Sequence, residues 1–152
     1  MNKNEPFSLW FDLIHDKLYN GDVIELPVLS GSMMPLLIPR KKIKIMSISW
    51  RDVQIGDIIV FKHEKILTAH RLLFKIILFN RSFFYQKGDV NRFGNWINKD
   101  QIVGKVIFTQ DNSDKFVDLT TPDKKRRAKR EAVKQLLLIF FHVLLIIPRR
   151  IK

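Results

Sequence analysis

The sequence predicts a mainly β protein, in which one partly closed antiparallel sheet carries a short N-terminal helix and an apolar C-terminal helix. Between residues 23 and 110, short apolar or alternating segments are separated by turn residues, as in sheets and barrels. Residues 7–18 place apolar side chains at helical spacing. After Pro122 the composition changes abruptly to a basic and then an apolar segment. We therefore expect three parts, at 1–22, 23–122 and 123–152.

The β segments follow the N-terminal helix, which ends at the turn residues Asn20, Gly21 and Asp22. Residues 42–46 (Lys-Ile-Lys-Ile-Met) alternate polar and apolar, which is typical of a half-buried strand. The long apolar run at 66–79 is predicted to turn near Asn80 and Arg81 and to return as a hairpin. The expected strands are 23–29, 42–46, 58–61, 66–79, 82–86 and 101–110.

The C-terminal segment reads as one helix from an N-cap at Asp123 to about residue 147. Basic residues crowd 124–130, and in 136–147 only His142 is polar. A helix that is apolar on all sides must be covered by something. Its apolar part rises only about 18 Å, against a hydrocarbon core of roughly 30 Å. We therefore expect it to enter one leaflet or to pack on a partner.

Composition and charge exclude several function classes. The 152 residues carry a net charge of +12 and no cysteine, which rules out disulfides, zinc–thiolate sites and a thiol nucleophile. Such a charge favours a polyanion, either nucleic acid or an anionic lipid surface. The apolar helix beside the basic run favours lipid, so no nucleic acid partner is expected. The four histidines show no ligand spacing, so neither a metal nor another cofactor is expected.

The stretch at 30–35 (Ser-Gly-Ser-Met-Met-Pro) predicts a rigid corner that holds a serine hydroxyl in the open. Gly31 permits a tight turn and a close approach of another backbone. Pro35 fixes its own φ and restricts Met34. A serine hydroxyl needs a base to take its proton before it becomes a good nucleophile. A histidine such as His70, whose pKa is ordinarily about 6.5, can be that base.

Three further motifs follow in order: Gly-Asp-Ile-Ile-Val-Phe at 56–61, Ala-His-Arg-Leu at 69–72 and Lys-Gly-Asp-Val-Asn at 87–91. The ordered set resembles the type I signal peptidases, within the larger group that includes the LexA-type self-cleaving proteases. The first box is similar to that family's S-x-S-M-x-P box, and the last to its K-G-D-N-N box, with Val90 in place of one asparagine. His70 followed by Arg71 resembles the archaeal and endoplasmic-reticulum type. The resemblance covers about residues 26–107 and implies the sheet of the LexA and signal-peptidase type.

This resemblance implies a serine endopeptidase that cleaves a leader or signal peptide from a protein or peptide precursor. Ser32 would be the nucleophile and His70 the general base. The backbone N–H of Ser32 and the hydroxyl of Ser30 would bind the oxyanion. Met33 and Pro35, from the same box, are expected beside the substrate. Arg71 is expected to be structural and to pair with Asp89.

The chain departs from the family in two respects. Where the histidine-type enzymes carry a third, acidic triad member, this sequence has Phe-Gly-Asn-Trp at 93–96. We therefore expect a Ser32–His70 dyad supported by Asp89, with Asn95 as a neutral alternative. The sequence also shows no N-terminal membrane anchor. If the C-terminal run crossed the membrane, its charge bias would leave the β-domain in the cytoplasm, so a membrane-associated protein on the cytoplasmic face is favoured.

Other functions stay open at this point. A LexA-like regulator would need a helix-turn-helix domain, for which residues 1–29 leave no room. A catalytically impaired binding module of the same fold is favoured by the missing acid and opposed by the presence of Ser32 and His70. A nucleic-acid binder would use the basic run at 124–130.

Overall fold

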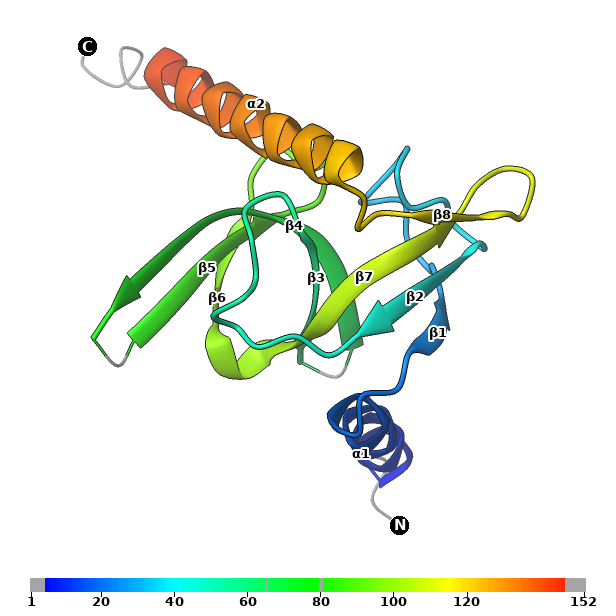
Figure 1. The fold of residues 1–152 in the computed structure, drawn as a ribbon. Helices are drawn as coiled ribbons and strands as arrows, with labels where there is room; N and C mark the ends of the chain where they lie inside the picture. The colour runs from blue at the N-terminus through cyan, green and yellow to red at the C-terminus, as the bar shows by residue number, and fades with distance from the viewer. Residues whose placement is uncertain (1–4, 65, 80, 147–152) are drawn as a thin grey trace.

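The structure, a computed structural model, describes residues 5–64, 66–79 and 81–146. It is mainly antiparallel β, with a sheet curled into a half-barrel, a short N-terminal helix and a C-terminal helix (Figure 1). The strand order is β1-β2-β7-β3-β4-β5-β6, and β8 pairs with β7. The elements are α1 (Glu5–Tyr19), β1 (Ile24–Pro27), β2 (Lys42–Met46), β3 (Ile58–His63), β4 (Ile66–Leu78), β5 (Arg81–Lys87), β6 (Asn95–Asn98), the 3₁₀ turn η1 (Lys99–Gln101), β7 (Ile102–Gln110), β8 (Phe116–Asp118) and α2 (Pro122–Ile146).

The predicted strands are present, and the structure adds β6 and β8. These two contain four and three residues, too few to show a period, and β6 begins and ends with asparagine. The N-cap prediction at Asp123 is wrong by two residues. The amide of Lys125 donates to the carbonyl of Thr121 (2.9 Å), so Pro122 is the first helical residue. Proline suits that position because its missing N–H would have no helical partner there.

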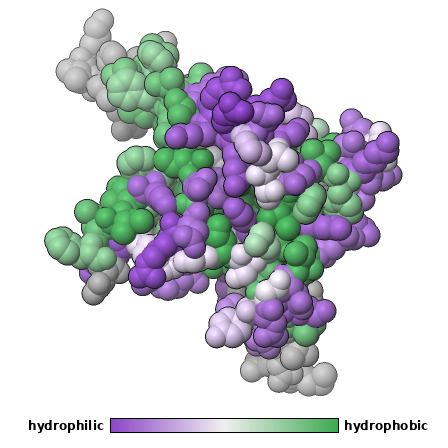
Figure 2. Space-filling model, in the orientation of Figure 1, coloured by the Kyte–Doolittle hydropathy of each residue, from purple (hydrophilic) through white to green (hydrophobic). Residues whose placement is uncertain are grey.

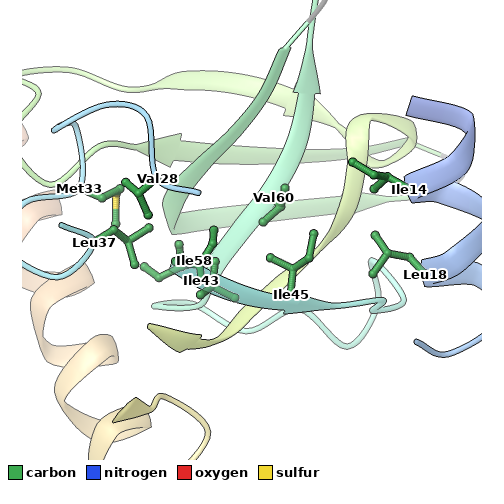
Figure 3. Packing of buried hydrophobic residues seen from close by; sticks show 10 residues of the cluster. Ile14, Leu18, Val28, Met33, Leu37, Ile43, Ile45, Ile58 and Val60 are labelled. Carbon is green, nitrogen blue, oxygen red and sulfur yellow. The ribbon is translucent and has the colours of Figure 1, made fainter. Parts of the chain in front are cut away.

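One hydrophobic core links the N-terminal helix to the serine corner (Figure 3). Ile14 and Leu18 of α1 lie at one end of it, near Ile45 and Val60. Val28, Met33 and Leu37 lie at the other end, and Met33 is 1% exposed. Burial of this kind stabilises by about 25 cal/mol per Å² of apolar surface. The residue next to Ser32 is therefore held by the core.

Strand β4 changes its partners along its length. Residues 66–71 pair with β3, whereas β5 pairs only from Arg71 onward, where Arg71 is opposite Lys87. Residues 66–70 therefore pair with β3 on one edge, and among the described strands none pairs with their opposite edge. That edge keeps backbone hydrogen-bonding groups free for an added strand.

The first half of α2 packs tightly on the sheet, and the second half does not. A Cβ on Gly56 would lie 2.7 Å from the backbone of Ala128, so only glycine permits this approach, and the φ of Gly56 is +97°. Ala132 and Gln135 are buried. The part of α2 that packs on the sheet therefore extends to Gln135. Beyond it, Leu137 to Leu145 are mostly exposed, and no described helix is long and apolar enough to cross a membrane.

Candidate active site

Ser32 lies in the loop after β1. The next residue, Met33, is buried, and the backbone of Ser32 contacts the Lys-Gly-Asp-Val-Asn segment. The amide of Met34 donates to the carbonyl of Gly31 (3.0 Å), which closes the turn. The carbonyl of Ser32 accepts from the amide of Val90 (3.1 Å). A Cβ on Gly88 would lie 2.8 Å from that same carbonyl oxygen, so glycine is needed there. The serine motif at 30–35 and the motif at 87–91 therefore fix the backbone position of Ser32 jointly.

His70 of β4 reaches Ser32 across 38 positions of sequence. Its Nε2 lies 3.1 Å from Ser32 Oγ, and its Nδ1 lies 2.6 Å from Oε1 of Gln86 on β5. The ring also meets Phe61 at 5.9 Å between centroids. The two residues predicted to form a dyad are thus within hydrogen-bonding distance, and a third group orients the histidine.

The Gln86 contact determines which imidazole nitrogen carries the proton. An amide oxygen can only accept, so Nδ1 must be the protonated nitrogen in neutral His70. Nε2 is then free to accept the Ser32 hydroxyl proton. This is the tautomer that a serine–histidine pair requires.

The surroundings of His70 favour its neutral form. Burial lowers the pKa of His70 below its ordinary value, while the Gln86 hydrogen bond and the charge of Asp89 oppose that change. The charges of Lys87 and His63 lower it further. A base that stays neutral is ready to accept a proton.

The other residues of the serine box occupy different environments. Ser30 is exposed, and its Oγ lies 3.3 Å from Ser32 Oγ, a position from which it can reach an oxyanion. Met33 lines the neighbouring cleft. Pro35 follows a cis peptide bond, is exposed and is not among the residues that line that cleft.

Asp89 is held by partners other than the histidine. Arg71 donates to both its carboxylate oxygens, from Nε (2.8 Å) and Nη2 (2.6 Å), so the expected ion pair is present. The two side chains are 4% and 10% exposed. Gln86, and not Asp89, makes the hydrogen bond to Nδ1 of His70. Asn95, the neutral alternative, is exposed on β6 opposite Gln86.

Helix α2 completes this second network. Nε2 of Gln135 donates to Asp89 (2.8 Å), and Oε1 of Gln135 accepts from the ammonium of Lys87 (3.1 Å). Lys87 also donates to the carbonyl of Gly88 (3.0 Å). Burial lowers the pKa of Lys87, and the charge of Asp89 opposes this. The Lys-Gly-Asp segment therefore ties the serine loop to the C-terminal helix.

An apolar cleft of about 430 Å³ opens beside Ser32. Residues 26–30 and residues 66–69 line it, together with Ser32, Met33, Leu37, Ile43 and Val60. Residues 66–69 belong to the part of β4 that pairs with β3 and not with β5. The cleft thus offers apolar side chains and free backbone groups next to a serine hydroxyl.

Sequence reasoning missed Gln86 and Gln135. Gln86 directly precedes the Lys-Gly-Asp motif, and its position on a strand predicted to pair with the one bearing His70 was the available signal. Nothing local marks Gln135, a lone amide between a basic and an apolar segment.

In the described part of the chain, no group of three His, Asp or Glu side chains is placed to hold a metal ion. Comparison with models of known protein families finds no match, and a search of curated protein sequences finds none either.

Proposed function

We propose that the protein is a serine endopeptidase of the signal-peptidase type, which cleaves a leader or signal peptide from a protein or peptide precursor. One observation carries this proposal: Ser32, His70 and Gln86 form a continuous hydrogen-bonded chain beside an open apolar cleft. The resemblance of the four ordered sequence motifs to that family supports the same reaction.

In the first half of the reaction, Ser32 Oγ attacks the carbonyl carbon of the scissile bond as its proton passes to Nε2 of His70. The imidazolium that forms keeps its Nδ1–H on the oxygen of Gln86. The oxyanion accepts hydrogen bonds from the Ser30 hydroxyl and the Ser32 amide. His70 then returns the proton to the leaving amine, and an acyl-enzyme remains on Ser32.

In the second half, water replaces the leaving peptide. His70 accepts a proton from that water as its oxygen attacks the acyl carbon. Collapse of the second tetrahedral intermediate releases the new carboxyl terminus, and His70 returns the proton to Ser32 Oγ, which restores the hydroxyl. Gln86 is neutral, so it orients His70 without adding the negative charge that an acidic third member would supply.

The cleft favours an extended peptide with apolar side chains. A substrate strand can pair with the free edge of residues 66–70 through main-chain hydrogen bonds. Its side chains would then lie against Met33, Leu37 and Val60. Leader and signal peptides are apolar segments of this kind, which is why we favour them over polar loops of folded proteins.

We place the enzyme at a membrane surface, on the cytoplasmic face. The exposed basic residues of α2 precede its exposed apolar half, an order that suits anionic headgroups and acyl chains. A precursor with an apolar leader would be concentrated at that same surface.

The test is Ser32-dependent cleavage of a peptide library. Wild-type protein and Ser32→Ala protein are incubated with peptides with and without anionic vesicles, and new termini are identified by mass spectrometry. Cleavage is expected with wild type only, after extended apolar segments. Absence of Ser32-dependent cleavage in folded protein would contradict the proposal and favour a catalytically impaired binding module.

A further inference from the structure

Two apolar projections extend from the same side of the molecule. One is the distal half of α2, where Leu137, Leu138, Phe140, Phe141, Leu144 and Leu145 are each about half exposed or more. The other is the end of the β4–β5 hairpin, with Ile77, Leu78 and Phe79. Both project toward the left in Figure 1, and both form apolar patches on that side in Figure 2. Monomeric soluble proteins rarely expose this much contiguous apolar surface.

The distribution of these side chains favours lipid over a protein partner. Successive helical residues differ by about 100° around the axis, so the exposed apolar residues from Leu137 to Leu145, with Val143 among them, span roughly 220° of the helix circumference, more than one face. A protein groove covers one face of a helix, whereas acyl chains cover all faces. The phenyl ring of Phe79 is fully exposed at the other projection, which again suits a surrounding solvent more than a single contact face.

The charges indicate which lipid. Lys125, Arg126, Arg127, Lys129 and Arg130 are exposed on α2, just before its apolar half. Arg81 is exposed at the start of β5, beside the other projection. Cations at the boundary between a polar body and an apolar tip match anionic headgroups above acyl chains. From Leu136 to Ile146 the helix rises about 16 Å, which is close to one leaflet of a bilayer.

We propose that the tip of the β4–β5 hairpin and the distal half of α2 insert together into one leaflet of an anionic bilayer. Two insertion points fix the orientation of the sheet relative to the bilayer surface, whereas a single inserted helix would allow the sheet to rotate relative to that surface. This inference rests on the membrane association proposed above for α2. It does not rest on proteolysis.

The experiment uses single-cysteine probes, because the natural sequence has no cysteine. Leu78→Cys, Leu144→Cys and Tyr19→Cys are each made in a Ser32→Ala background and labelled with an environment-sensitive fluorophore. Tyr19 is 83% exposed on α1 and is the control. With phosphatidylcholine–phosphatidylglycerol vesicles, the probes at 78 and 144 are expected to shift to the blue and to be quenched by doxyl lipids, and the probe at 19 is not.

Each other outcome is decisive. A probe at 78 that stays in water while the probe at 144 enters lipid overturns the hairpin contact and leaves the α2 association intact. Probes that both stay in water overturn the membrane proposal altogether. A blue shift that grows with protein concentration and needs no vesicles identifies a second copy of the chain as the occupant instead.

A matched pair of variants measures the strength of the hairpin contact. Leu78→Ser with Phe79→Ser is expected to weaken vesicle partitioning roughly tenfold, because two large apolar side chains no longer enter the leaflet. Tyr19→Ser with Val23→Ser removes exposed apolar groups elsewhere and is expected to change nothing. Equal partitioning of the two double variants contradicts the proposal. Ser32→Ala protein that binds vesicles but cleaves nothing keeps this result separate from the test of proteolysis.

Discussion

Two polar networks lie back to back in the sheet, and they start from neighbouring residues. His70 and Gln86 form the proposed catalytic network with Ser32, whereas Arg71 and Lys87 form an anchoring network with Asp89 and Gln135. Because side chains alternate between the faces of a strand, adjacent residues of β4 and β5 serve the two networks separately. The first network contains no charge while His70 is neutral, and it opens on the cleft. The second is ionic and closed by α2.

This difference teaches that the carboxylate of a motif need not contact the histidine that the motif was expected to support. Asp89 pairs with the buried guanidinium of Arg71 and accepts a hydrogen bond from Gln135 of α2. The neutral amide of Gln86 makes the hydrogen bond to His70 instead. Substitutions in the catalytic network should change rates with little effect on folding. Substitutions in the anchoring network should change stability first. The following predictions test that separation.

The largest expected effect is on the catalytic network. Ser32→Ala and His70→Ala should each lower kcat/KM by on the order of 10³-fold or more, and the double variant should be little worse, because the two groups act as a unit. Thermal unfolding should stay near that of wild type, since neither side chain is in the core. A folded His70→Ala protein with full activity would remove the catalytic role of His70.

The next effect is on stability. Asp89→Asn leaves Arg71 buried without its counter-charge, and breaking a buried pair costs about 3–5 kcal/mol. Urea unfolding should show that loss, while kcat per folded molecule should fall much less than in His70→Ala. A stable Asp89→Asn protein with no activity would place Asp89 in the catalytic network.

Gln135→Ala should cost about 1–3 kcal/mol, since it removes one partner from Lys87 and one from Asp89. Truncation after residue 136 is the matched comparison, because it removes the apolar half of α2 and keeps Gln135. We expect the truncated protein to melt near wild type and Gln135→Ala protein to melt lower. The opposite order would mean that the distal half of α2 holds the fold.

A smaller effect is expected at Gln86. Gln86→Ala removes one hydrogen bond worth about 1 kcal/mol, so kcat should fall roughly five- to tenfold. The comparison is with Asn95→Ala on the opposing strand, which should leave kcat unchanged because Asn95 is exposed and the hydrogen bond to His70 comes from Gln86. If Gln86→Ala and Asn95→Ala lower kcat equally, the effect would come from the pairing of β5 with β6 and not from the hydrogen bond to His70.

The smallest effect is a shift of the pH profile. His70 must be neutral to accept a proton, so kcat/KM should be full above the pKa of His70 and fall as pH drops through it. Burial lowers that pKa, and the acidic limb should therefore lie below about pH 6.5. Gln86→Glu places a carboxylate on Nδ1, favours the imidazolium and should raise the limb by about one pH unit. If the acidic limb of the Gln86→Glu protein lies at the same pH as that of wild type, the pKa of His70 does not determine the limb.

Local patterns were sufficient for much of the fold. The strands could be predicted from the alternation in β2 and from the long apolar run of β4. Their ends could be predicted from turn residues near Gly21 and Gly56, each only a few positions away. The strands β6 and β8 were not predictable because their short segments have no period and form by pairing with neighbours already in place.

The sequence by itself predicted that Ser32 and His70 act as a pair, through the order of its motifs, and the structure brings the two side chains within hydrogen-bonding distance. Only the tertiary structure decided what surrounds them. Whether Asp89 or Gln86 faces Nδ1 depends on strand register and on the face each side chain takes, and a one-residue change of register reverses both. The role of Gln135 depends on a helix meeting the sheet 46 positions away from Asp89, a contact that no local pattern encodes.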